Sequence, residues 1–239
     1  MTSYFQRYAS GQHDAVWREL RALGPVPPAL HDDVAAVCAV TMERVAGQVA
    51  RLATMLPELG FVGVDVPLHR PPTDADRRTV AELDEEIGGL PAALTACLQV
   101  VGGVSFLGDW EAINLHYQHG PGQSTMPPGP EYPDPLWLCD AALLRCEWEE
   151  FQEEPDEDGF LFVVAPDELH KANVSGGSHD VALPDRCADP VLLGVAGRPG
   201  ITLVEYLRES IAWGGFPGWS FHGGAAPDAL APLRAQPDF

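Results

Sequence analysis

The sequence predicts an α+β fold in which helices pack on the outer side of a curved, mostly antiparallel sheet, preceded by an N-terminal helical extension. Two observations predict this class. Apolar residues at helical spacing dominate the first hundred positions. Short apolar runs of β-like composition follow, separated by Gly, Pro and acidic residues. The chain has 239 residues and is 46% hydrophobic, which is enough for one principal domain with a substantial core.

Residues 1–70 are predicted to form the helical extension. Apolar residues at helical spacing indicate a short helix that ends at Gly24, then a long amphipathic helix that ends at Pro57. The proline-rich segment 61–73 indicates either a short edge strand or an extended connector. It leads to the main domain, which is predicted to cover residues 71–221.

Two helices joined by a tight turn are predicted to open the main domain. The apolar stripes of segments 75–88 and 91–101 each stop at a glycine pair. The short apolar runs after them indicate antiparallel strands, and helical spacing returns over 202–213. The last segment, 222–239, is predicted to be a weakly ordered tail.

The segment from Leu83 to Gly108 resembles the opening signature of the SMI/KNR superfamily, also called SUKH. It reads LDEEIGGLPAALTACLQVVGGVSFLG, with an acidic helix, a glycine before Leu-Pro, a second helix, a Gly-Gly turn and a strand. As an arrangement of elements, the resemblance extends over residues 75–216. It implies one α+β domain with helices outside a curved sheet. The superfamily includes bacterial immunity proteins that neutralise toxins, often nucleases, and fungal regulators of cell-wall synthesis, and it implies no catalytic residues.

Charge and composition restrict the classes of partner. Fourteen basic and 35 acidic residues give a formal net charge of −21, which repels nucleic acid and anionic lipid and attracts basic proteins. No stretch approaches the roughly 20 apolar residues of a membrane-spanning helix, and the first residues lack a signal-peptide pattern. We therefore expect a cytoplasmic protein with a basic protein partner, and neither nucleic acid nor membrane as a partner.

Metal and cofactor signals are weak in this sequence. Its five cysteines include no CxxC pair and indicate reduced thiols, and its eight histidines include no HExxH motif. We therefore expect no metal and no cofactor.

An acidic segment with interleaved aromatic residues is the first candidate protein-binding surface. Carboxylates can steer a basic partner and aromatic rings can anchor it. The alternative is a solvated loop whose two aromatics turn into the core. The segment could also extend a strand or begin as a helix. The candidate binding residues are Trp148, Glu149, Glu150, Phe151, Glu153, Glu154 and Asp156.

The segment WGGFPGWSF is the second candidate surface. Its Gly-Gly and Pro-Gly pairs stop a helix and place aromatic residues on irregular backbone. These rings either close the end of the core or form part of a recognition groove. The candidate residues are Trp213, Phe216 and Trp219.

A Ser- and His-rich segment, 175–180, allows a third hypothesis, a hydrolase. A nucleophilic triad needs a serine, a base and an acid in a fixed geometry, and neighbourhood in sequence does not supply it. A hairpin with a Gly-Gly turn explains the same residues, so we predict no catalytic residue and no enzyme.

These observations lead to one principal hypothesis, a cytoplasmic protein-binding module. In its specific form it is an immunity protein that covers the active cleft of a basic, nuclease-like toxin domain. The alternative is a regulatory or scaffolding protein without a toxin partner. The sequence predicts no particular oligomeric state.

Overall fold

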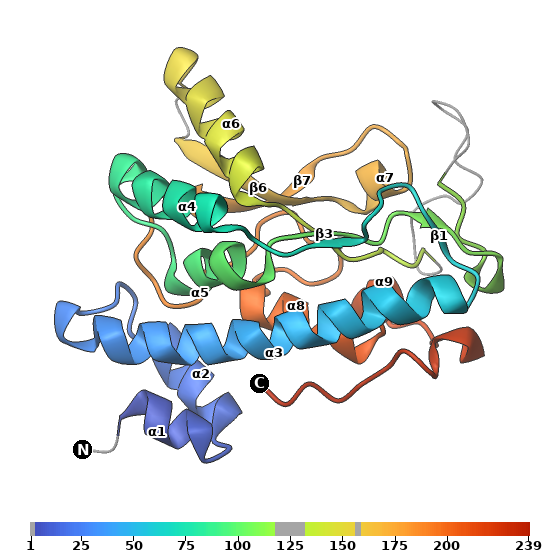
Figure 1. The fold of residues 1–239 in the computed structure, drawn as a ribbon, viewed down its shortest axis with the longest axis horizontal. Coiled ribbons are helices and arrows are strands. Elements are labelled where there is room, and N and C mark those ends of the chain that lie inside the picture. The colour runs from blue at the N-terminus through green and yellow to red at the C-terminus, as the bar shows by residue number, and fades with distance from the viewer. Residues whose placement is uncertain (1–2, 118–131, 156–158) are drawn as a thin grey trace.

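The structure is a computed structural model, and it describes residues 3–117, 132–155 and 159–239. It is an α+β fold in which short antiparallel strands lie between layers of helices (Figure 1). The predicted fold class is therefore confirmed.

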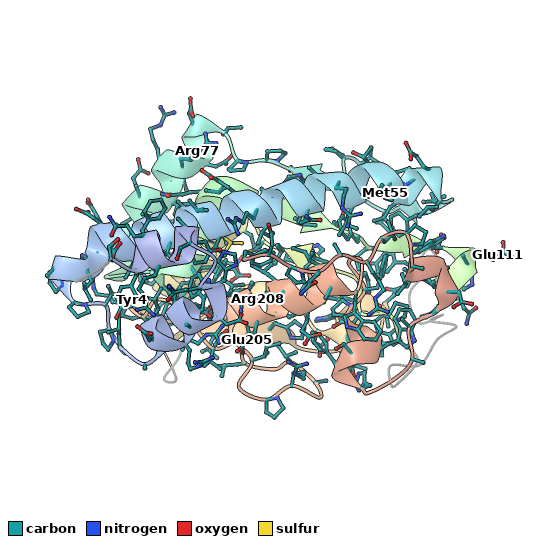
Figure 2. All side chains as sticks on the ribbon, turned by 90° about the horizontal axis from the view of Figure 1, so that it is seen from below. Tyr4, Met55, Arg77, Glu111, Glu205 and Arg208 are labelled. Carbon is teal, nitrogen blue, oxygen red and sulfur yellow. The ribbon has the colours of Figure 1, made fainter. Side chains whose placement is uncertain are left out.

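The N-terminal part is helical, as predicted. It consists of α1 (Tyr4–Ala9), α2 (His13–Arg21), a short 3-10 helix (Pro28–Leu30) and α3 (His31–Glu58). The sequence analysis did not predict α1, whose first turn is capped by the Ser3 hydroxyl, which accepts from the Gln6 N–H. Helix α3 runs along most of the molecule (Figure 2).

Within the described residues, the strands form three short antiparallel sheets. They come from both sides of the predicted domain boundary at residue 70. The segment 61–73 contributes strands instead of a plain connector, and its pairs are with strands of the main domain. The sheets are β1 (Val62–Gly63) with β4 (Gly108–Asp109); β2 (His69–Arg70), β3 (Gly103–Ser105) and β5 (Trp137–Leu138) in that order; and β6 (Phe160–Pro166) with β7 (Ser178–Leu183). The last two sheets meet where the Cys139 N–H donates to the Val164 carbonyl at 3.0 Å.

The predicted helix pair at the start of the main domain is confirmed. Helix α4 (Asp74–Ile87) begins at a capping box between Thr73 and Asp76. It ends at Gly88, whose φ of 93° needs a glycine. Helix α5 (Ala92–Ala96) follows, and its last turn widens into a π-helical turn, Cys97–Val101.

The remaining helices cover the sheets and close the chain. They are a 3-10 helix (Glu111–Ile113), α6 (Ala141–Glu153), α7 (Glu168–Lys171), α8 (Leu203–Ala212), α9 (Gly218–Phe221) and a 3-10 helix (Asp228–Leu230). Helix α8 confirms the helical spacing of 202–213.

One hydrophobic core includes residues from both sides of the predicted boundary at residue 70. Val45 and Leu52 of α3 are fully buried, and α3 packs against α5 and α8. Arg21 of α2 also binds Asp189 at 2.8 Å and Glu205 of α8 at 2.5 Å. Figure 2 shows Glu205 on α8 beside the N-terminal helices. Independent folding of residues 71–221 stays a prediction, but the N-terminal helices are packed into the body of the fold.

The C-terminal segment 222–239 differs from the weakly ordered tail that was predicted. Leu230, Leu233 and Phe239 are buried in the core. Arg208 of α8 also donates to the Phe239 carbonyl at 2.5 Å. The apolar residues of this segment are too few to show a period, so their burial depends on the surface that the rest of the chain offers.

Candidate protein-binding surface

Helix α6 contains most of the acidic segment, and its start explains why the segment is helical. The Asp140 carboxylate accepts from the Leu143 N–H at 3.1 Å and caps the first turn. Trp148 and Phe151 lie three residues apart and thus on one face of the helix. Both rings pack on Phe160 of β6, with centroids 5.2 Å apart in each case.

The packing of the two aromatic residues corrects one of the predictions. Trp148 and Phe151 are half-buried against the core, so they hold α6 on the sheet and are not free anchors for a partner. Glu147 also faces inward, where its carboxylate accepts from the Val163 N–H at 2.9 Å. Burial raises the pKa of Glu147 to about 7.

The other acidic residues of α6 are exposed, and α4 adds more beside them. Glu149, Glu150, Glu153 and Glu154 face solvent, whereas Asp156 lies outside the described residues. Helices α4 and α6 pack against each other on one side of the molecule, at the top of Figure 1. We define the α4–α6 acidic face by seven exposed carboxylates: Glu82, Glu85, Glu86, Glu149, Glu150, Glu153 and Glu154.

Arg145 joins the two helices of this face. Its guanidinium contacts Glu86 at 2.7 Å and Glu82 at 3.4 Å. This hydrogen-bonded contact lowers the pKa of the Glu86 carboxyl. The contribution of α4 was missed at the sequence level, although the acidic residues at helical spacing in 82–86 were visible there. The packing of α4 against α6 was not visible in the sequence, because the two segments are far apart in the chain.

The second candidate surface closes the core. Phe216 is fully buried against Trp110, with ring centroids 5.7 Å apart, and Trp219 is 5% exposed. Trp213 is half-buried under the Arg234 guanidinium, 4.6 Å from its ring centroid. Phe216 and Trp219 are therefore not available to a partner. The helix stop at Gly214 turns the chain back over the core, which explains why these rings point inward.

The Ser- and His-rich segment does not assemble a triad. Ser178, His179 and Asp180 are consecutive residues of β7, and neighbouring side chains of a strand point to opposite faces. His179 is 1% exposed, and neither of its ring nitrogens has a hydrogen-bond partner among the described residues. The residues before Gly176 form α7 and turns, so the predicted first strand of this hairpin is β6 (Phe160–Pro166) instead.

A buried ion pair near this segment was not predicted. Lys171, which ends α7, has its ammonium 2.7 Å from Asp134 and 3.2 Å from the Tyr206 hydroxyl. The Lys171 side chain is 0% exposed and that of Asp134 is 3% exposed. Burial opposes the charge on Lys171, but Asp134 and Tyr206 together raise the pKa of Lys171 above its ordinary value. The lysine is therefore held as a cation in this buried ion pair.

Neither a metal site nor a membrane-spanning helix is found in the part of the chain that the structure describes. Within residues 3–117, 132–155 and 159–239, no three His, Cys, Asp or Glu side chains come together as a metal site. No helix in the same part of the chain has the length and apolar composition to cross a bilayer.

Comparisons with known proteins add no further assignment. No protein-family model, no curated protein and no solved structure matches this chain.

Proposed function

We propose that this chain is a protein-binding module that holds a basic protein partner on its α4–α6 acidic face. The observation that carries this proposal is the packing of α4 against α6, two helices far apart in sequence that both carry exposed carboxylates. With a net charge of −21, the molecule attracts a cationic partner from a distance, and the acidic face orients it.

Packing beneath the face supports this role, because it fixes the positions of the carboxylates. Trp148 and Phe151 hold α6 on β6, and α6 packs against α4. A face that is already ordered loses little conformational entropy when a partner binds. An acidic loop of the same composition would lose more.

In its specific form, the proposal is a cytoplasmic immunity protein for a basic, nuclease-like toxin domain. The active cleft of a nuclease is electropositive because it binds a polyanion. A row of carboxylates on two fixed helices complements such a cleft and would block it. The resemblance of residues 83–108 to the SMI/KNR superfamily supports the same role, since that superfamily includes immunity proteins.

Binding kinetics at two salt concentrations test the proposal. The immunity proposal predicts that a secreted protein with a basic carboxy-terminal domain is encoded beside this gene, and that domain, purified in an inactivated form, is the probe. We expect the change of Glu149, Glu150, Glu153 and Glu154 to Gln to slow association about tenfold at low salt, with little change in dissociation. Salt should reduce the association rate of the wild-type chain more than that of the variant.

The matched control carries the same loss of charge elsewhere. Glu43, Glu58, Glu111 and Asp228 are exposed carboxylates on other elements, and they are changed to Gln or Asn. This control should reduce association by much less than the α6 variant. Equal rates for the two variants would reject the acidic face. Failure of the wild-type chain to protect cells that express the active toxin domain would reject the immunity role.

A further inference from the structure

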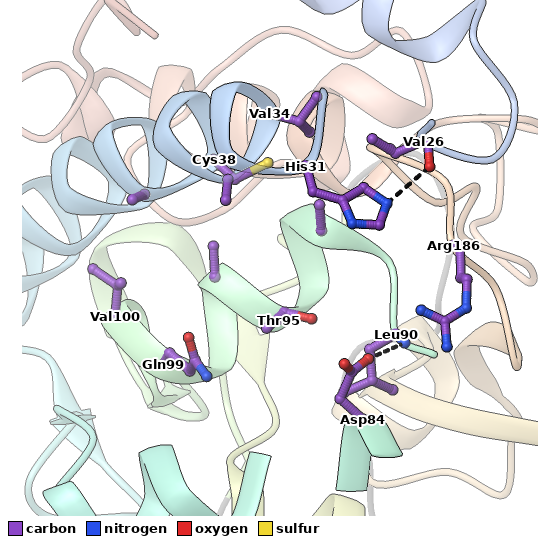
Figure 3. Close-up of a pocket in the computed structure, with 14 residues that line it drawn as sticks. Val26, His31, Val34, Cys38, Asp84, Leu90, Thr95, Gln99, Val100 and Arg186 are labelled. Carbon is purple, nitrogen blue, oxygen red and sulfur yellow. Dashed lines mark hydrogen bonds between the residues drawn. The ribbon is translucent and has the colours of Figure 1, made fainter. Parts of the chain in front are cut away.

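A pocket of about 360 Å³ opens between α3 and α5, apart from the exposed carboxylates of the acidic face (Figure 3). Small side chains on the facing helices leave this space. Ala35 and Ala39 lie one turn apart on α3, and Ala92 and Ala96 lie one turn apart on α5. Each pair therefore lines the pocket from one helix face.

The inner wall of the pocket is apolar. Val34, Leu90 and Cys38 are buried there, and Val100 completes the wall from the π-helical turn. Burial raises the pKa of the Cys38 thiol, so this group stays neutral. The wall thus suits a hydrocarbon group and offers no nucleophile.

The lining of the pocket also includes a carboxylate and a guanidinium, those of Asp84 and Arg186. Asp84 accepts from the Leu90 N–H at 2.6 Å, and Arg186 donates to the Gly88 carbonyl at 2.8 Å. Gly89 lies between these contacts, and a Cβ there would approach the Arg186 side chain to 2.7 Å. The backbone of residues 88–90 therefore holds the side chains of both Asp84 and Arg186.

The two charged groups keep unused hydrogen-bonding atoms. Among the residues that the structure describes, neither Asp84 nor Arg186 has an ion-pair partner. Asp84 uses one oxygen for Leu90, and Arg186 uses one nitrogen for Gly88. The second carboxylate oxygen and the remaining guanidinium N–H groups are left for a ligand.

His31 and Gln99 add polar atoms to the lining. The Nε2 atom of His31 lies 3.0 Å from the Val26 carbonyl, which can only accept, so Nε2 carries the proton. The Nδ1 atom of a neutral ring is then an acceptor, and Figure 3 shows it on the pocket side. Gln99 lines the pocket from the π-helical turn, a geometry that is frequent at functional sites.

We propose that this pocket binds a free α-amino acid with an apolar side chain. The ammonium group of the ligand pairs with Asp84, its carboxylate pairs with Arg186, and its side chain lies among the alanines. A zwitterion satisfies both of these charges, whereas a simple acid or amine leaves one of them unpaired. The volume is at the lower end of the range of small-molecule sites, which suits a ligand of this size.

Calorimetry with the full chain tests the ligand class. The probes are L-phenylalanine, 3-phenylpropionate, which lacks the ammonium group, and phenethylamine, which lacks the carboxylate. We expect saturable binding of phenylalanine and binding at least about tenfold weaker for the other two, since each loses one charge-assisted contact. Equal affinity for all three probes, or no binding of phenylalanine at about 10 mM, would overturn the proposal.

Substitutions locate the binding to this pocket. Asp84→Asn keeps an acceptor for the Leu90 N–H but removes the negative charge, and Arg186→Gln removes the positive charge. Each of these two variants should weaken phenylalanine binding at least about tenfold. Ala39→Leu should abolish binding by filling the space. Exposed neighbours serve as controls, with Glu85→Gln and Arg78→Gln expected to leave binding unchanged. Thermal unfolding verifies that every variant is folded.

The test of phenylalanine binding can fail or succeed independently of the test of association with a basic protein partner. The four Glu→Gln changes on α6 should leave phenylalanine binding unchanged, and Ala39→Leu should leave association with the basic partner unchanged. Phenylalanine binding that survives Asp84→Asn, Arg186→Gln and Ala39→Leu would place the ligand elsewhere and reject this pocket.

Discussion

The acidic face and the buried ion pair use charge in opposite ways. The α4–α6 acidic face presents seven carboxylates to solvent, where water and salt screen each of them. The buried pair consists of the Lys171 ammonium and the Asp134 carboxylate, which lie 2.7 Å apart and away from solvent. Lys171 is also the only lysine in the sequence. From this comparison we expect surface charges to act mainly on the proposed encounter with a partner. We expect the loss of one member of the buried pair to cost more stability than the loss of an exposed carboxylate.

The largest effect is expected when the buried pair is broken. Lys171→Met leaves the Asp134 carboxylate buried without a counter-charge, which should reduce the free energy of unfolding by about 3–5 kcal/mol. Urea unfolding at neutral pH measures the change. The exposed pair between Arg7 and Glu19 is the control, and Arg7→Gln should change the free energy of unfolding far less than Lys171→Met does.

A double variant separates loss of charge from loss of packing. Asp134 has a φ of 49°, which Asn also adopts readily, so Asp134→Asn causes no new backbone strain. Combined with Lys171→Met, it removes both charges and should recover about 2 kcal/mol relative to Lys171→Met alone. A cost below about 1 kcal/mol for the single variant would show that water reaches the pair and would break the comparison.

The next largest effect is expected in the pH dependence of stability, to which His179 and Glu147 contribute with opposite signs. Burial, aided by the nearby Lys171 cation, lowers the pKa of His179 to about 4. The unfolded chain has an ordinary histidine pKa of about 6.5 and binds the proton first, so stability falls as the pH drops from about 6.5 to 4. The loss reaches about 3 kcal/mol. Glu147, with its pKa raised to about 7, has the opposite effect, and stability rises as the pH drops from about 7 to 4.5.

Two single variants separate these contributions. Of these two contributions, Glu147→Gln keeps only that of His179, so stability should fall more steeply than in the wild-type chain as the pH is lowered. His179→Gln keeps only that of Glu147, and this variant should lose less stability over the same range. The measurement is the free energy of unfolding between pH 4 and pH 7. Parallel profiles for the two variants would contradict the burial of both groups.

Local signals predicted α3, α4, α5 and α8, because the apolar stripe and the stop signal of each helix lie close together in the sequence. Helix α6 was left open between strand and helix, and the four-residue helices α7 and α9 were not predicted. The helix pair over 75–101 followed from its glycine and proline stops, and α4 and α5 lie there. Helix α1 was missed, since six residues show too little of a period. The burial of the tail was missed because it depends on a surface made by the rest of the chain.

The candidate sites depended on contacts that the sequence does not display. Glu149, Glu150, Glu153 and Glu154 are exposed, and their role in binding stays a prediction. The inward direction of Trp148 depends on Phe160, which lies further along the chain on β6. Asp134 and Lys171 are 37 residues apart, so no spacing rule links them. The pocket between α3 and α5 likewise requires two helices to face each other through alanines.

The smallest effect on stability is expected at the acidic face itself. Arg145 contacts Glu86 and Glu82, but those carboxylate side chains are 42% and 64% exposed. Arg145→Gln should therefore change the free energy of unfolding by no more than about 1 kcal/mol, and the difference should shrink at high salt.

The same substitution removes a positive charge from the face, so association with a basic partner should become faster at low salt and more dependent on salt. Urea unfolding and association kinetics, each at low and high salt, measure the two effects. A loss of more than about 2 kcal/mol would show that Arg145 belongs to a structural network that holds α4 to α6. The acidic face would then resemble the buried pair, and the contrast between the two regions would not hold.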